Sequence, residues 1–388
     1  MAVLCGPAGN KFLFSTDDKL IKPWWPKSVS QALLFESSYK SSLLEDNSFL
    51  KLDSMHHYVP IMDSTAKDHL KMNWVPYDVV KVHPLVKQFT FVLACRLFIN
   101  YFDDQVKALA KPFFVVARGI VSAPVNFPGT PFNAAVKGGA VIKEKLVEIV
   151  RQRRTEMTAT GNDVVGQDLL SKLIFSCGKD GVYYSEEDIA SKIIGYLIAS
   201  FYTTSSAITF VLSHLADHPG VYDRVLEEQM EIAKTKEEGE LLNWGDIQRM
   251  KYTWNVVCES MRLIPPAHGG FKEVLSDFTF AGFNIPKGWK AFWTVHSTNK
   301  NPKYFHDPEK FDPSRFEGKG PLPFTYVPFG GGPRMCAGKE YARIEILVFV
   351  HNVVTRFKLK KVNPNVKIIY SPDPVPVEGS PMCLQPHK

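Results

Sequence analysis

The chain has 388 residues, of which 45% are hydrophobic and 22% charged, so it is long enough to bury a large core. Its formal net charge of +6 is a mild excess that neither requires nor suggests nucleic acid as a partner. The six cysteines are scattered without a C-x-x-C pair, which argues against a disulfide framework or a paired-cysteine zinc site and favours a reducing compartment.

The first residues contain no run of about 20 apolar residues and no basic segment followed by a long apolar one, so they predict neither a membrane span nor a signal peptide. Residues 85–99 are nearly all apolar, which predicts a buried helix that is too short for a convincing membrane span. A loop at residues 128–131 precedes a predicted helix through residues 151–154, whose arginines we expect to be solvated.

A second long apolar helix is predicted to begin at a cap formed by residues 185–188 and to end at His218-Pro219-Gly220. Residues 278–280 and 283–285 flank Ala281-Gly282 as a predicted hairpin, and residues 289–293 predict a third strand. Because no internal repeat or second domain is apparent, we predict a single domain over residues 1–388.

A charged pair lies in the segment between these elements. Glu259 and Arg262 stand at i and i+3, where they share a helix face and can form an ion pair. Alone, such a pair is usually a solvated surface salt bridge. If Arg315 reaches it from a later loop, the three residues would form a buried network whose role is structural.

The most informative stretch is Pro-Phe-Gly-Gly-Gly-Pro-Arg-Met-Cys-Ala-Gly at residues 328–338. Its glycines allow tight bends and the close approach of backbone N–H groups to the sulfur of Cys336. The following residues, 339–350, have helical periodicity, which would place a helix N-terminus beside that sulfur. A phosphate-binding loop is excluded because five residues separate Gly332 from Gly338 and glutamate follows Lys339.

This stretch is suited to presenting one thiolate to a haem iron. Such a site requires a single anionic sulfur in a mostly dry pocket, with donors that tune the metal. Phe329 can pack over the sulfur, and the guanidinium of Arg334 can pair with a haem propionate. A glycine-rich loop around an ordinary buried cysteine is the alternative.

Phe329-x-x-Gly332-x-Arg334-x-Cys336-x-Gly338 resembles the haem-binding signature of the cytochrome P450 superfamily. Glu259-x-x-Arg262 resembles the E-x-x-R motif of that family, and residues 311–316 resemble its P-x-R-F region. The three motifs occur in the family's order.

The resemblance implies a mainly α fold with small β-sheets and a bound haem b whose iron is axially ligated by Cys336. Phe329, Gly330, Gly332 and Gly338 would shape the haem-binding loop. Arg334 is then a propionate partner, as is Lys272, which stands where relatives commonly have arginine. The usual arginine near residue 40 has no counterpart except Lys40, whose more ordinary interpretation is a surface lysine. The start of the chain resembles a segment that follows the family's anchor, first helix and first strands, so we expect an N-terminally truncated member.

The helix that crosses the haem in this family has A/G-G-x-D/E-T at its centre, where an acid and an alcohol relay protons. This chain reads Ala199-Ser200-Phe201-Tyr202-Thr203. Thr203 therefore matches the threonine, whereas Tyr202 replaces the acid and Ser200 the glycine. A phenol is a poorer proton relay near neutral pH than a carboxylate. The hydroxyls of residues 203–206 could instead carry a water chain, or they could bond back to helix carbonyls.

Longer matches resemble the plant triterpene oxidases of the β-amyrin 28-monooxygenase group: residues 24–26, 128–133, 228–234, 243–247 and 311–320. The implied function is oxidation of a pentacyclic triterpene such as β-amyrin, with a diterpenoid of the taxane type or a sterol as alternative substrates. A catalytically impaired remnant is the alternative from another functional class.

The resemblance also implies partners and a location. Electrons would come from NADPH-cytochrome reductase, and the endoplasmic reticulum membrane is the expected location even though the chain lacks an anchor. Cations on the cysteine side are candidates for docking the reductase, although such a charge run is most often a solvated face: Lys339, Arg343, Lys358, Lys360 and Lys361.

Overall fold

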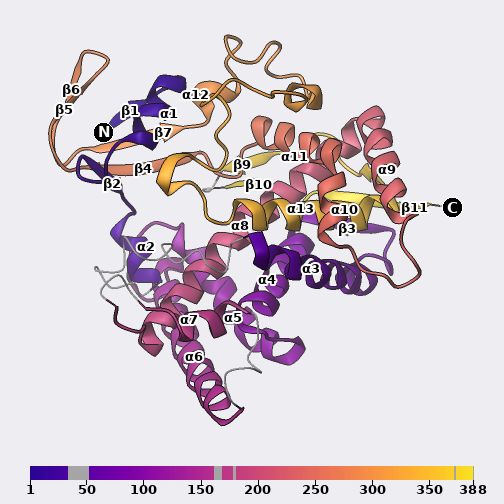
Figure 1. Cartoon of the computed structure of the whole chain (residues 1–388), viewed down its shortest axis with the longest axis horizontal. Helices are drawn as coiled ribbons and strands as arrows, with labels where there is room; N and C mark the ends of the chain where they lie inside the picture. The colour runs from indigo at the N-terminus through magenta and orange to yellow at the C-terminus, as the bar shows by residue number, and fades with distance from the viewer. Residues whose placement is uncertain (34–51, 161–167, 178–180, 371–372, 388) are drawn as a thin grey trace. The chain divides into compact units, whose positions relative to one another are not determined.

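The computed structural model describes residues 1–33, 52–160, 168–177, 181–370 and 373–387, and its fold is mainly α with small β-sheets, as the sequence predicted (Figure 1). Lys40 lies outside the described residues. The chain divides into two compact units, each built from segments that are distant in sequence. One unit comprises residues 1–24, 59–87 and 202–388, and the other comprises residues 25–58 and 88–201.

The second of these units is helical throughout its described elements. Four helices lie wholly within it: α2 (Lys27–Ala32), α5 (Asp103–Ile120), α6 (Pro131–Thr160) and α7 (Leu169–Ile174). Three other helices contribute residues to both units: α3 (Leu52–Asn73), α4 (Val82–Ile99) and α8 (Glu186–Asp217). In the predicted cap of α8, Ser185 Oγ accepts a hydrogen bond from the Asp188 N–H, and the Asp188 carboxylate accepts one from the Ser185 N–H, both at 3.1 Å.

Within the described residues, two helices, α4 and α8, are long and apolar enough to cross a membrane by length and composition alone. Most of each apolar window is buried in the protein, as in the core helices of many proteins. The helix predicted over residues 85–99 is thus present as α4, with one additional turn at its start.

The expectation of solvated charges in residues 151–154 is wrong for Arg153. Its guanidinium donates to Asp168 Oδ2 at 2.6 Å and to the Ile99 carbonyl at 3.1 Å, and its side chain is 13% exposed. The partner carboxylate also caps α7, because it accepts a hydrogen bond from the Ser171 N–H. Arg153 therefore helps hold α6 against the start of α7.

The first unit contains the other helices and strands that the structure describes. Its helices are α1 (Gly6–Ser15), α9 (Pro219–Ala233), α10 (Trp244–Arg249), α11 (Lys251–Leu263), α12 (His296–Asn299) and α13 (Lys339–Val354). A four-stranded sheet has the order β1 (Ala2–Leu4), β7 (Lys290–Thr294), β4 (Gly269–Val274), β2 (Ile21–Pro23). Figure 1 shows the indigo N-terminal strands beside the orange ones, so the start of the chain completes a sheet formed some 270 residues later.

The smaller sheets include the predicted hairpin. β5 (Phe278–Phe280) and β6 (Phe283–Ile285) pair antiparallel across Ala281 and Gly282, which both have the positive φ that this type of turn requires. The strand predicted at residues 289–293 is present as β7, but it pairs with β1 and β4 rather than with the hairpin. The remaining strands are β3 (Val79–Lys81), β8 (Phe357–Lys361), β9 (Ile368–Tyr370), β10 (Pro374–Pro376) and β11 (Pro381–Pro386).

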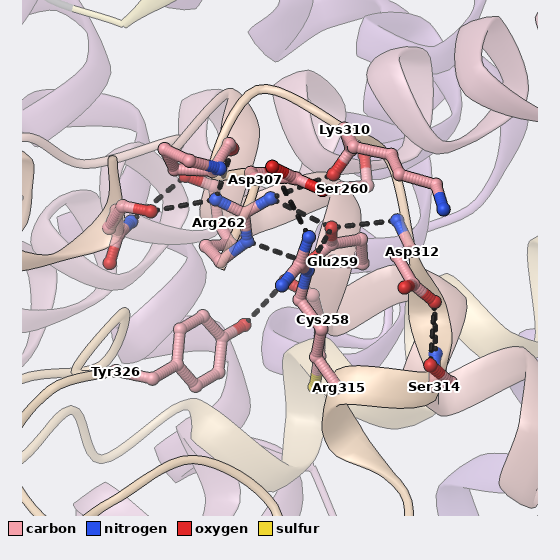
Figure 2. A network of polar contacts seen from close by, with 12 residues as sticks. Cys258, Glu259, Ser260, Arg262, Asp307, Lys310, Asp312, Ser314, Arg315 and Tyr326 are labelled. Carbon is pink, nitrogen blue, oxygen red and sulfur yellow. Dashed lines mark hydrogen bonds and ion pairs between the residues drawn. The ribbon is translucent and has the colours of Figure 1, made fainter. Parts of the chain in front are cut away.

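The predicted charge network is buried in this unit (Figure 2). Arg262 Nε donates to Glu259 Oε2 at 2.7 Å, and its Nη2 donates to Oε1 at 2.8 Å, with both side chains fully buried. Arg315 Nε donates to the same Oε1 at 3.3 Å. Arg262 also donates to the carbonyls of Asn299 and Pro308, each at 2.7 Å. The network therefore connects α11 to the end of α12 and to the segment around residues 308–315, and the predicted burial of the three charged residues together is confirmed for Glu259 and Arg262.

Candidate active site

The loop that carries Cys336 is folded against α1. Gly330 and Gly332 have φ values of +70° and +67°, which side chains rarely adopt. A Cβ atom on Gly332 would lie 1.9 Å from the Phe14 carbonyl oxygen, and one on Gly331 would lie 2.7 Å from the Phe14 ring. Glycine is therefore required at residue 332 by backbone conformation and by this close approach to α1.

Backbone hydrogen bonds fix the position of Cys336. Its N–H donates to the Phe329 carbonyl at 2.9 Å, and the Gly330 N–H donates to the Val327 carbonyl at 3.0 Å. The backbone donor that reaches the sulfur is the Gly338 N–H, at the start of α13. The expectation that residues 330–332 supply this donor is therefore wrong for Gly330, whereas the predicted helix N-terminus does lie beside the sulfur.

The thiol of Cys336 is accessible to solvent, although protein atoms surround much of it. This desolvation raises its pKa, and the hydrogen bond from Gly338 opposes the rise by favouring the thiolate. A metal bound to the sulfur would act in the same direction as Gly338, because metal coordination requires the thiolate. The loop thus presents one accessible sulfur with a backbone donor already directed at it.

The two predicted propionate partners, Arg334 and Lys272, lie within electrostatic range of one another. Arg334 Nη2 contacts the carboxylate of Asp18 at 2.7 Å, and Lys272 Nζ donates to the Leu13 carbonyl at 2.7 Å. Burial lowers the pKa of Lys272, Asp18 raises it, and Arg334 lowers it further by repulsion. Two cations therefore gather beside α1 with the carboxylate of Asp18 next to them, which leaves local positive charge for an anionic ligand.

Tyr202 and Thr203 lie on α8, in the part that belongs to the same unit as the cysteine loop. The ammonium of Lys87 on α4 lies 5.0 Å from the centroid of the Tyr202 ring. Thr203 is exposed to solvent. Of the hydroxyls that follow, Ser205 Oγ donates back to the Tyr202 carbonyl at 3.1 Å, as the second alternative predicts, whereas Ser206 Oγ donates at 3.1 Å to the Pro374 carbonyl instead.

The candidate docking cations differ in exposure and in whether they already form ion pairs. Lys358 and Lys360 are exposed and alternate along β8 with buried residues. Arg343 forms an ion pair with Glu340 at 2.8 Å, and Lys361 forms one with Asp217. Lys358 and Lys360 are therefore the more accessible members of the set.

Sequence reasoning missed three residues that contact these groups: Leu13, Phe14 and Asp18. They belong to α1 and the turn after it, and they are more than 250 residues distant from the groups they contact. No periodicity or spacing in the sequence could have paired them.

Comparison with known proteins places these features in a family. The cytochrome P450 family model matches residues 99–375. The chain is also 52% identical to the β-amyrin 6-β-monooxygenase of Solanum lycopersicum, over 100% of this chain and 83% of that protein. The chain belongs to the cytochrome P450 family.

Other relatives agree with this assignment. A β-amyrin 28-monooxygenase of the same plant and one of Kalopanax septemlobus are each 50% identical to this P450, over 100% of its chain and 82% of theirs. Among solved structures, the retinoic acid-bound cyanobacterial CYP120A1 superposes with a TM-score of 0.88 at 28% identity, covering 99% of this chain and 89% of that one. The predicted fold and enzyme class are thereby confirmed: a P450 monooxygenase with haem held by a cysteine thiolate and electrons supplied by a redox partner.

The residues present fit a haem. Cys336 provides an accessible sulfur with a hydrogen-bond donor at the start of a helix. Arg334 and Lys272 provide two cations near each other, which suits the two propionates that a haem carries. The loop glycines exclude Cβ atoms where the backbone meets α1.

Proposed function

We propose that this P450 oxidises a pentacyclic triterpene such as β-amyrin. The observation that carries the proposal is the identity of 50% or more, over the whole chain, with plant enzymes named for β-amyrin oxidation. Those relatives are named for different carbons, C6 and C28, so the proposal covers the substrate class and leaves the position of oxidation open. We also propose one catalytic domain over residues 1–388, and the family match to residues 99–375, which include segments of both compact units, supports it.

In the proposed mechanism Cys336 holds the haem iron as its thiolate, supported by the N–H of Gly338. Phe329, Gly330 and Gly332 shape the loop, while Arg334 and Lys272 pair with the propionates. The bound haem supplies the activation of dioxygen and the insertion of one oxygen atom into a C–H bond. We assign proton delivery to Thr203 and Tyr202, because they occupy the sequence positions of the threonine and the acid in the family's motif on this helix.

Electrons are proposed to come from NADPH through a cytochrome reductase that docks on the cysteine side. Lys339 and Arg343 are the better candidates for this surface, because they lie in the first turns of α13 next to Cys336, whereas Lys358 and Lys360 on β8 follow the opposite end of that helix. We propose the endoplasmic reticulum membrane as the location, by similarity to plant P450s of this group.

The test is a two-part measurement on protein expressed with its haem. Reduced protein under carbon monoxide should give the red-shifted absorbance band of a thiolate-ligated haem. Membranes that contain this P450, a plant cytochrome reductase and NADPH should then convert β-amyrin into a product one oxygen atom heavier, detected by mass spectrometry. A matched preparation of Cys336→Ala, which removes the sulfur, should yield no product.

The other substrates and the remnant alternative are outcomes of the same experiment. If the thiolate band is present and β-amyrin gives no product, but a taxane-type diterpene or a sterol does, the substrate belongs to that other class. Well-folded protein without the thiolate band would identify a remnant that does not perform the reaction.

A further inference from the structure

Helices α5 and α6, which both lie wholly within the compact unit of residues 25–58 and 88–201, form a groove between them. Its volume is about 510 Å³, within the range of about 300–1,000 Å³ that small-molecule sites occupy. The apolar part of its lining includes Pro112 and Val115 from α5 and Gly138 and Val141 from α6. Because Val115 is 37% and Val141 44% exposed, the groove leaves apolar surface open that a hydrocarbon could cover.

The two helices meet at the floor of the groove. A Cβ atom on Gly138 would lie 3.2 Å from the Pro112 carbonyl oxygen and 3.2 Å from Val116 Cγ2, so α6 approaches α5 closely there. Pro112 lies inside α5 and has no N–H, which leaves the carbonyl of Ala108, one turn earlier, without its usual donor in the helix. Lys145 Nζ donates to that carbonyl at 3.0 Å. The ammonium of Lys145 therefore joins the two helices.

Four lysines line the groove, and two of them are already engaged. Lys145 holds the Ala108 carbonyl, and Lys107 forms an ion pair with Asp104 at 2.7 Å. Lys111 and Lys137 are exposed, and neither has a hydrogen-bond or ion-pair partner among the residues that the structure describes. These two ammonium groups are therefore available to a ligand.

The two available lysines lie on opposite helices at the same point of the groove. Lys111 immediately precedes Pro112 and Lys137 immediately precedes Gly138, the residues at which the helices meet. The charge around them has one sign, since residues 105–143 contain five basic residues and no aspartate or glutamate. A lysine-rich face alone is most often solvated. Here the paired ammonium groups stand over exposed apolar surface, an arrangement that suits a carboxylate attached to a hydrocarbon.

We propose that this groove binds a free long-chain carboxylic acid, with its carboxylate between Lys111 and Lys137 and its hydrocarbon over Val115 and Val141. Charge complementarity selects an anion, and the apolar lining selects one that carries a hydrocarbon. A bilayer would present a plane of headgroups, whereas a groove of this volume takes one molecule. The inference goes beyond the proposed function and does not depend on it.

The first experiment is a calorimetric titration of the haem-loaded, full-length chain with palmitate, kept below the concentration at which it forms micelles. We expect saturable binding that weakens as the salt concentration rises, because salt screens charges at an exposed site. Methyl palmitate keeps the chain but lacks the charge, so it should bind several-fold more weakly. Absence of saturable palmitate binding, or equal binding of the ester, would overturn the proposal.

Groove variants locate the site. Lys111→Gln and Lys137→Gln should each raise the Kd for palmitate by about two- to fivefold, as expected for one exposed ion pair, and the double variant by about fourfold or more. Val141→Glu, which places a carboxylate in the groove, should also raise the Kd. The matched control is Lys143→Gln, a change to a lysine of α6 that does not line the groove, and it should leave the Kd unchanged. Urea unfolding midpoints of these surface variants should match that of wild type.

The outcomes separate this proposal from its alternatives. Palmitate that binds with the same Kd to all the groove variants would occupy another part of the protein, which would refute the site. Vesicles of phosphatidylcholine, with and without phosphatidylserine, test a membrane as the source of the anion. Vesicle binding that requires Lys111 and Lys137, without binding of monomeric palmitate, would assign the groove to a membrane surface and also refute the proposal. Palmitate binding in protein without the thiolate band would count against the proposed function alone.

Discussion

The strongest test of the fold is the removal of Glu259. Its carboxylate accepts hydrogen bonds from Arg262, from Arg315 and from the N–H of Asp312, at 2.7 to 3.3 Å. Glu259→Ala would leave the fully buried guanidinium of Arg262 with carbonyl partners alone. Breaking a buried pair in this way costs about 3–5 kcal/mol.

That loss is large relative to the total, because the free energy of unfolding of a protein domain is about 5–15 kcal/mol. With a urea dependence of about 3 kcal/mol per molar, the unfolding midpoint should fall by about 1 to 1.7 M. Much of the protein should then be recovered as aggregate without haem. Soluble protein would be measured by urea unfolding, and haem content by absorbance per mole of protein.

Two matched variants isolate the cause. Glu259→Gln keeps the shape and one acceptor oxygen but loses the charge, so its midpoint should lie between those of wild type and Glu259→Ala. Lys107→Ala breaks an i, i+3 pair with the same 2.7 Å contact at an exposed site, and we expect no measurable shift. If Glu259→Ala were as stable as Lys107→Ala, with full haem content, the buried network would not hold the fold.

Three further predictions concern the haem loop and the helix after it. Cys336→Ala should abolish the thiolate band under carbon monoxide while circular dichroism stays near wild type; retained turnover would exclude the thiolate. Gly332→Ala should lose haem because its Cβ would overlap the Phe14 carbonyl, whereas Gly338→Ala, whose Cβ would lie 3.9 Å from the sulfur, should retain it; equal haem content would contradict the steric argument. Burial raises the pKa of Glu345 well above its usual value. Its contribution to the free energy of unfolding is therefore fully present below the unfolded-state pKa of about 4.3, and it is lost as the pH rises toward the folded-state pKa. Glu345→Gln should therefore match wild type near pH 4 and be more stable near pH 8 by urea unfolding; parallel pH profiles would contradict this.

Local sequence patterns predicted the elements whose interactions are local. The cap at Ser185 and the helix after Gly338 depend on neighbours within four residues. The turn at Ala281-Gly282 requires positive φ at both residues, and the sequence provides a glycine there. Glu259 and Arg262 are likewise one helical turn apart. In each case the interacting residues are only a few positions apart in the sequence, which is the range over which a periodic pattern carries information.

The contacts that sequence could not predict connect distant segments. Arg334 meets Asp18 across 316 residues, and Lys272 meets the Leu13 carbonyl across 259. β7 was predicted as a strand, yet its partners are β1 and β4 rather than the adjacent hairpin. Propensity indicates that a strand forms, but its neighbours are decided by which apolar faces become buried together.

These long-range contacts converge on α1, which therefore acts as part of the candidate haem site. The Phe14 carbonyl and ring require glycine in the cysteine loop, and the Leu13 carbonyl holds the ammonium of Lys272. Asp18, just beyond the helix, holds the guanidinium of Arg334. This ten-residue helix and the turn after it thus contact the loop and both cations. A change in α1 should therefore alter the positions of the Cys336 sulfur and of both propionate partners together, although none of the residues of α1 is proposed to touch the haem.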